Sequence, residues 1–202
     1  MTSNQVQKLK LASFSSLLLG AMLLLGGCIV TSVYPFYDAK SLSFEPRLLG
    51  QWNVETDSGE ASEQWTFEQE TNHSFKVSYV NNQTTSVMQG HTFKLKGELF
   101  LDLFTTDIDD EHQPPPIPAH MVVRLVEVGT TMRMVPMNYE WLGELLEKNP
   151  KALRHHIICA EEKKEHQRLV LTADTPELQR FLVAHLKTSE AWKGESKLRK
   201  KT

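Results

Sequence analysis

Apolar and polar residues alternate in successive short stretches between Leu48 and Val135. In the stretch SFKVSY, residues 74–79, every second side chain is apolar. A period of two is typical of antiparallel strands that bury one face. Turn-forming pairs such as Lys96-Gly97 separate the stretches. Because the edges of a meander must be closed or covered, we expect a mainly β fold, either a β-barrel or a strongly curved antiparallel meander.

The apolar side of these strands would form the interior of the barrel. A small barrel is either filled by its own side chains or holds one small ligand. The inward residues would therefore line a site for a small apolar ligand if a lumen is present, and would form an ordinary core if it is not. The inward candidates are Trp65, Phe67, Phe75, Val77, Tyr79, Leu101, Met121, Val123 and Met132.

Two helices are expected after the strand-rich region, near 139–148 and 176–187. Asn138 can cap the first helix, and Thr175 can cap the second, with Pro176 at its first helical position. Apolar residues recur at helical spacing in both segments. We therefore expect both helices to pack against the sheet.

The segments that flank the predicted β domain, residues 47–188, differ from it in composition. The stretch from Ile29 to Pro46 contains the sequence VYPFY, which is too apolar for a free linker and should pack against the domain or, as the alternative, lie in the membrane interface. Residues 189–202 are rich in lysine and arginine, and we expect a disordered basic tail. The proline-rich run 107–118 would be a long loop, because proline cannot donate to a strand ladder.

The start of the chain has three parts in a fixed order. A polar segment containing Lys8 and Lys10 precedes an uncharged apolar run, residues 11–27, and two glycines then precede Cys28. This order is typical of a secretory signal peptide. A membrane-spanning helix would need about 20 predominantly apolar residues, and this run is shorter and contains serines.

The sequence Leu25-Gly26-Gly27-Cys28 resembles the lipobox of bacterial lipoproteins. The resemblance implies that residues 1–27 are a signal peptide, that Cys28 carries diacylglycerol and that residues 28–46 are a lipidated tether. Each buried methylene of an acyl chain contributes about 0.8 kcal/mol, so two or more chains form an anchor that does not readily exchange. By resemblance to enterobacterial sorting, Ile29 after the cysteine favours the outer membrane, facing the periplasm, over the inner membrane.

A second resemblance lies at the start of the strands. Gly50-Gln51-Trp52 resembles the G-x-W motif of lipocalins and related calycin barrels. The resemblance implies that Trp52 plugs the closed end of a barrel and that an arginine near the last strand, here Arg168, stacks on it. The chain from Ile29 onward is also similar to an uncharacterised group of bacterial lipoproteins, through YPFY, GQW, ELFLDLF and LTADTPELQRFL. That second similarity brings no function with it.

The charge balance argues against nucleic-acid binding. The chain has 22 Lys and Arg against 25 Asp and Glu, and removal of the signal peptide takes away Lys8 and Lys10 but no acid. Nucleic-acid affinity depends chiefly on neutralising phosphates with cations. A mildly acidic body therefore points to other partners.

The sequence contains no nucleophile, phosphate-loop or metal motif that stands out. The densest cluster is His155, His156 and Cys159, which would share a face only on a helix. The run Ile157-Ile158 favours a strand, in which residues four apart are separated by about 13 Å. We therefore expect no catalytic residue, no metal site and no cofactor.

Together these features predict an outer-membrane-anchored periplasmic binding or interaction module. Its partners would be the membrane, through the acyl chains on Cys28, and a small hydrophobic ligand or an envelope protein. One alternative is a partner-binding subunit of an envelope complex with a solid core. The other is an envelope enzyme or metal-binding protein that uses His155, His156 and Cys159.

Overall fold

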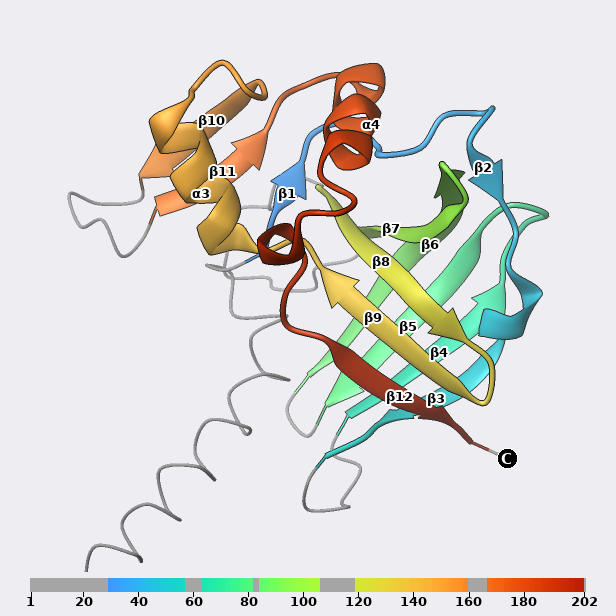
Figure 1. The fold of residues 1–202 in the computed structure, drawn as a ribbon. Coiled ribbons are helices and arrows are strands. Elements are labelled where there is room, and N and C mark those ends of the chain that lie inside the picture. The colour runs from blue at the N-terminus through green and yellow to red at the C-terminus, as the bar shows by residue number, and fades with distance from the viewer. Residues whose placement is uncertain (1–28, 57–62, 82–83, 106–118, 160–166, 202) are drawn as a thin grey trace, which may run out of the picture.

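The fold is a closed antiparallel β-barrel with two helices packed outside it (Figure 1). The computed structural model describes residues 29–56, 63–81, 84–105, 119–159 and 167–201. None of the helices within these ranges is long and apolar enough to cross a bilayer.

Eight strands form the barrel wall, and every neighbouring pair is antiparallel. The last strand pairs with β3 on one side and β9 on the other, and β8 pairs with β9, so the wall is continuous. The prediction of a mainly β, lipocalin-like fold with two packed helices is confirmed. The barrel strands are β3 (Gly50–Val54), β4 (Glu63–Gln69), β5 (Phe75–Asn81), β6 (Thr85–Leu95), β7 (Glu98–Thr105), β8 (His120–Val128), β9 (Thr131–Pro136) and β12 (Ser196–Lys200).

Strand β12 corrects the prediction of a disordered basic tail at 189–202. Leu198 is completely buried and pairs with Val54 on one side and Met132 on the other. The basic residues on either side of it point outward, where Lys197 and Arg199 both form ion pairs with Glu55. Composition alone suggested disorder, but strand pairing on both sides, the buried Leu198 and the ion pairs with Glu55, just after β3, hold this segment in the wall.

The barrel interior is filled by apolar side chains from all sides. Its closed end is covered by the 3₁₀ helix η1 (Pro46–Leu48), from which Leu48 is completely buried. Just before it, the ring of Phe44 stacks on Phe75 with the ring centroids 4.6 Å apart. The segment that enters the barrel therefore also closes one end of it.

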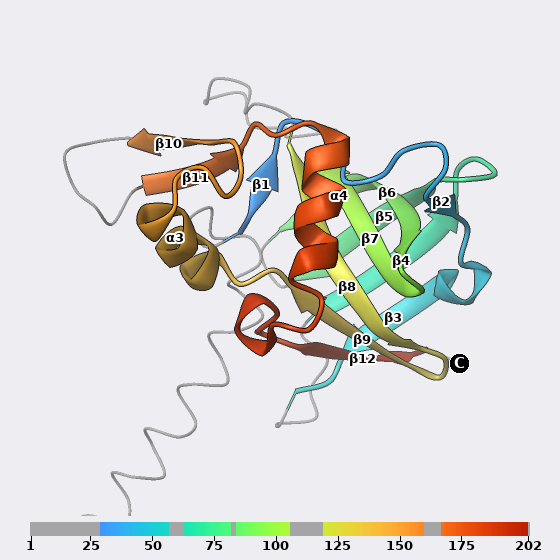
Figure 2. The same cartoon turned by 45° about the horizontal axis from the view of Figure 1, so that its top comes forward.

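A second core lies on the outer face of the barrel, between strands β6 to β8 and the helices. Figure 2 shows α4 (Thr175–Ala184) in front of this face. Phe93 and Phe100 from the barrel belong to the same buried cluster as Leu142 from α3 (Tyr139–Lys148) and Phe181 from α4. Both helices occur where the sequence predicted them.

The caps of the two helices differ in how well they were predicted. Asn138 caps α3, with its side chain accepting from the backbone N–H groups of Glu140 and Trp141. Asp174 caps α4, not Thr175 as expected, because the Asp174 carboxylate accepts from the Glu177 N–H at 3.0 Å. The hydroxyl of Thr175 instead donates to the backbone carbonyl of Pro35 at 2.7 Å.

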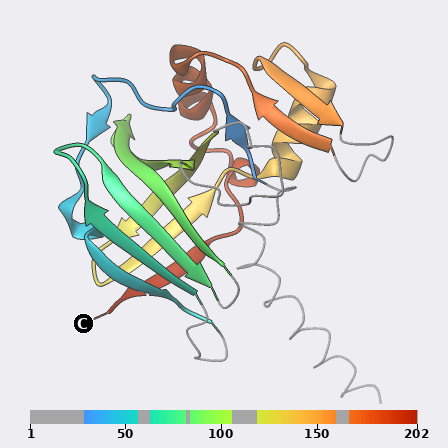
Figure 3. The same cartoon turned by 180° about the vertical axis from the view of Figure 1, so that it is seen from behind.

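The N-terminal segment, interpreted as a tether over residues 28–46, is part of the fold from Ile29 onward. Seen from behind in Figure 3, it runs from β1 (Thr31–Ser32) past the barrel to β2 (Leu42–Ser43). Strand β1 pairs with β8 and with β11 (Gln167–Leu171), which in turn pairs with β10 (His155–Cys159). Phe36 is buried, as packing of VYPFY predicted, whereas Tyr34 is 48% exposed.

Candidate functional site

The barrel does not contain a ligand-sized lumen in its described part. A cavity of about 40 Å³ lies at the end opposite η1, bordered by Trp65, Tyr79, Met121 and Val123, and by Ile29 at the start of the described chain. Small-molecule sites usually measure about 300–1,000 Å³. All the predicted inward residues do face the interior, but they pack as core. The remaining members of that set are Phe67, Phe75, Val77, Leu101 and Met132.

Trp52 lies at the closed end of the barrel, as the sequence predicted, but the cation near its ring is Lys200 and not Arg168. The indole N–H of Trp52 donates to the Leu48 carbonyl at 2.7 Å. Lys200 Nζ lies 5.2 Å from the centroid of the Trp52 ring. Arg168 is exposed on β11, outside the barrel, where it pairs with Ile158. The assignment of Arg168 is wrong because the last barrel strand is β12, which follows α4.

Gly50 lies beside the contact between Lys200 and Trp52 and has a backbone conformation that favours glycine. Its φ of +115° lies in a region that L side chains rarely adopt. A Cβ atom there would also lie 3.3 Å from Lys200 Cε. The glycine of the G-x-W motif thus permits both the turn into β3 and the approach of Lys200.

The histidine and cysteine cluster lies on strand β10, as the run of isoleucines predicted. His155 pairs with Leu171 of β11 and Cys159 pairs with Gln167, so the strand holds these two residues apart. The ring Nδ1 of His155 lies 2.9 Å from the Leu153 carbonyl. Across the described ranges, no three His, Cys, Asp or Glu residues are grouped so as to hold a metal ion.

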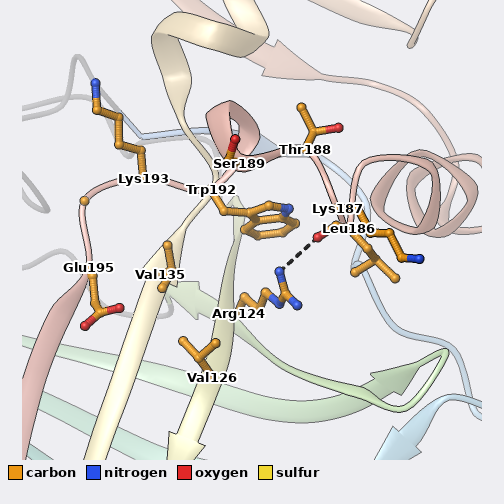
Figure 4. A pocket seen from close by; sticks show the side chains of 11 residues that line it. Arg124, Val126, Val135, Leu186, Lys187, Thr188, Ser189, Trp192, Lys193 and Glu195 are labelled. Atoms are coloured by element: carbon orange, nitrogen blue, oxygen red, sulfur yellow. Dashed lines mark hydrogen bonds between the residues drawn. The ribbon is translucent and has the colours of Figure 1, made fainter.

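A larger recess lies on the outside of the barrel, with a volume of about 510 Å³ (Figure 4). One wall is the outer face of β8 and β9, from which Arg124, Val126 and Val135 point into it. The other wall is the chain that leads from α4 to β12 and includes η3 (Ser189–Ala191). The remaining lining residues are Leu186, Lys187, Thr188, Ser189, Trp192, Lys193, Gly194 and Glu195.

Trp192 stands in the centre of this recess and is held from several sides. Its indole N–H donates to the His185 carbonyl at 3.0 Å, and its ring lies 5.7 Å from that of Phe100. The Arg124 guanidinium lies 5.9 Å from the ring centroid. The same guanidinium donates to the Leu186 carbonyl at 3.0 Å and to Glu98 at 2.8 Å. These contacts fix the orientation of the indole ring in the recess.

The charges around the recess are unequal. Glu195 is bound in a bidentate pair by Arg133, at 2.8 and 2.6 Å, and these hydrogen bonds hold the pKa of Glu195 below its usual range. Lys187 and Lys193 are exposed and have no ion-pair partner among the described residues. Among the described lining residues, the one acid is therefore neutralised while two cations have no acidic partner.

A buried polar cluster lies on the outer face of β7, away from the recess. The Asp102 carboxylate is completely buried and accepts from the Phe36 N–H at 2.9 Å, while its other oxygen lies 2.7 Å from His120 Nδ1. Tyr37 stacks on His91 with ring centroids 4.4 Å apart. Burial, reinforced by the Asp102 charge, raises the pKa of Tyr37 to about 12. Burial also lowers the pKa of His91.

The sequence did not indicate the recess or Asp102. Trp192 and Lys193 belong to the segment that was interpreted as a disordered tail, and Arg124 stands in an otherwise ordinary strand. Asp102 interrupts the apolar run ELFLDLF, which is the one signal that could have marked it as a buried partner of another segment.

The fold and its recess define a filled eight-stranded barrel with a concave, cationic and aromatic surface on its outer wall. No family model, curated protein or solved structure matches the chain.

Proposed function

We propose that this protein is a lipid-anchored envelope lipoprotein that works as a binding module, with the filled barrel as a rigid scaffold and the outer recess as the binding site. The contrast between the two volumes carries the proposal. About 40 Å³ inside the barrel is too little for an organic ligand, whereas about 510 Å³ outside it is within the range of small-molecule sites.

The proposed anchor would hold the barrel close to the membrane. Cys28, in its lipobox context, would carry the acyl chains, and β1 begins at Thr31. The intervening residues span at most about 10 Å when extended. With Ile29 favouring the outer membrane, the domain would face the periplasm with the end that contains the small cavity nearest the lipid.

The anchor is tested by intact mass spectrometry of the protein extracted from its native host. We expect a mass that corresponds to residues 28–202 plus acyl chains, and loss of membrane association in Cys28→Ala. An uncleaved chain, or a cleaved chain without acyl groups, would contradict the lipoprotein assignment.

The recess is tested by extracting the small molecules that co-purify with the protein in the same preparation. Val126→Trp should fill the recess and abolish co-purification of its ligand. Val80→Trp is the matched control, because Val80 on β5 is exposed to a similar degree, 39% against 44% for Val126, and lies elsewhere on the barrel. A ligand that remains bound in Val126→Trp would place its site outside the recess.

A second candidate function, a partner-binding subunit, is favoured by strand β10. This strand is at the end of the sheet, with no further described strand beside it, and Ile157 is 48% exposed and Ile158 38% exposed. Exposed edges with apolar side chains can accept a strand from a partner. A photo-crosslinking amino acid at position 157 should then capture an envelope protein in the native host, and the same amino acid at position 80 should not.

A further inference from the structure

We propose that the recess binds an organic anion, with the acid group held by Arg124 and the apolar body resting on Trp192, while Lys187 and Lys193 on the two sides of Trp192 make the recess electropositive. This inference rests on the proposed function, since it assigns a ligand class to the same recess. It follows from three features: the unused N–H donors of Arg124, the two lysines without an acidic partner and the apolar surface of the lining.

Arg124 is placed to bind an acid group. A guanidinium has five N–H donors, and the described contacts of Arg124 use three of them, two toward Glu98 and one toward the Leu186 carbonyl. Only 19% of the side chain is exposed, so its charge is less screened than that of a surface arginine. The two remaining N–H groups can donate to a carboxylate, sulfonate or phosphate oxygen.

The net charge of the lining selects anions over cations. Glu98 is paired with Arg124, and Glu195 is paired with Arg133. The one acid among the described lining residues is Glu195, so a cationic ligand that used it would have to break its pair with Arg133, whereas an anion would meet Lys187 and Lys193 without displacing any described partner. Charge complementarity therefore points in one direction.

The apolar part of the lining limits which anions fit. Trp192 presents an indole in the centre of the recess, and Val126 and Val135 lie beneath it on β8 and β9 (Figure 4). An inorganic ion would leave this surface exposed to water, whereas an aromatic or aliphatic body would cover it. The ligand class is therefore an acid attached to an apolar group.

The test uses naphthalene-2-carboxylate and its neutral analogue naphthalene-2-carboxamide as probes. The full chain, in non-ionic detergent, is titrated to millimolar probe while the indole N–H resonance of Trp192 is followed by NMR. Trp192→Phe identifies that resonance among those of the other tryptophans. We expect the carboxylate to shift it at concentrations about tenfold lower than the amide does, as for two to three partly exposed charge contacts.

Substitution of the two lysines tests whether charge contributes to binding in addition to shape. Lys187→Gln/Lys193→Gln should weaken the carboxylate about tenfold and leave the amide unchanged. Lys151→Gln is the matched control, because Lys151 is exposed and lies outside the recess.

Equal binding of the two probes, or a double variant that binds the carboxylate like the wild type, would overturn the anion inference and leave the recess as a neutral site. If neither probe shifts the Trp192 resonance, the inference is overturned. Val126→Trp then decides separately whether the recess is a site at all.

Discussion

The carboxylate of Asp102 accepts the backbone N–H of Phe36 at 2.9 Å and thereby fastens the N-terminal segment to the outer wall of the barrel. Its second oxygen lies 2.7 Å from His120 Nδ1. Asp102 has no exposed surface, so neither oxygen can turn to water if these partners are lost. The N-terminal segment is therefore coupled to the barrel by one side chain of β7.

Replacing Asp102 by alanine should lower the free energy of unfolding by about 3 kcal/mol, because the Phe36 N–H and His120 both lose a charged, buried partner. Asp102→Asn should cost less, since its amide oxygen can still accept from Phe36. Guanidinium unfolding followed by tryptophan fluorescence measures both values. Glu68→Gln, an exposed acid on β4, is the control and should change little. If Asp102→Ala proves as stable as the wild type, the contacts of Asp102 with Phe36 and His120 do not contribute to the free energy of unfolding.

Acidification should destabilise the protein partly through His91. Burial is the largest effect on this group and lowers its pKa, although the Asp102 charge acts in the opposite direction. A histidine has a pKa of about 6.5 in the unfolded chain, so below that pH the unfolded state takes up a proton that the folded state resists. The contribution of His91 to stability is therefore complete above pH 6.5 and falls as the pH drops toward its folded pKa.

His91→Phe should reduce this acid sensitivity. The phenyl ring can keep the stacking on Tyr37, and within the described residues the buried Nδ1 of His91 has no hydrogen-bond partner to lose. The measurement is the free energy of unfolding at pH 7.5 and 5.5, with His156→Phe, an exposed site on β10, as the control. An unchanged difference between the two pH values in His91→Phe would assign the acid sensitivity to other groups.

The inner face of the barrel could be predicted from the sequence because its physical signal is local. Alternation puts every second residue inside, so Trp65, Phe75 and Val77 could be assigned without any knowledge of strand order. Whether those residues enclose space or fill it depends on how side chains from opposite walls meet. Gly90 and Val77 are an example: they approach closely on neighbouring strands, and no local pattern in the sequence predicts that contact.

The recess could not be predicted from the sequence, for a different reason. The recess combines residues of β8 with residues that lie more than sixty positions later, as in the contact between Arg124 and Leu186. It exists only because β12 returns to the barrel, and the return depends on Leu198, the single apolar residue in SKLRK. A charged segment with one leucine gives no local signal for a strand, so both the last strand and the recess beside it were missed.

Lys200 should stabilise the closed end of the barrel through the Trp52 ring. A cation near an indole face contributes about 0.5–2 kcal/mol, depending on how far it is desolvated. Lys200→Met also removes the hydrogen bond from Nζ to the Arg47 carbonyl at 3.1 Å, and together these losses should lower the free energy of unfolding by about 1 kcal/mol. Lys200→Arg keeps a cation that can donate, as the lipocalin resemblance implied for this position, and should restore most of the loss. Arg168→Met tests the original assignment and should have no effect, because Arg168 is exposed on β11. Equal costs for Lys200→Met and Arg168→Met would contradict the role given to Lys200.

Ending the chain after Glu195 should abolish cooperative unfolding. The truncation removes β12, which opens the edges of β3 and β9 and exposes Val54 and Met132, the pairing partners of Leu198. A disordered tail could be removed with a change of less than about 0.5 kcal/mol, as for an exposed surface. Ending the chain after Lys200 keeps the strand and is the control. A truncated protein with the wild-type unfolding transition would restore the interpretation of these residues as a tail.

Gly90→Ala distinguishes a filled barrel from a hollow one. A Cβ atom at this position would lie 2.8 Å from Val77 Cγ2 and 3.4 Å from Leu101 Cδ1, on the inner side of β6. In a filled barrel Val77 cannot move aside, and overpacking of this kind costs about 1–3 kcal/mol. Gly143→Ala is the matched control: nothing lies within 4 Å of its Cβ position in α3, so the substitution should instead stabilise the helix by about 0.5–1 kcal/mol. If Gly90→Ala is tolerated as well as Gly143→Ala, the interior has room to yield, and the argument for a binding site on the outside of the barrel loses its basis.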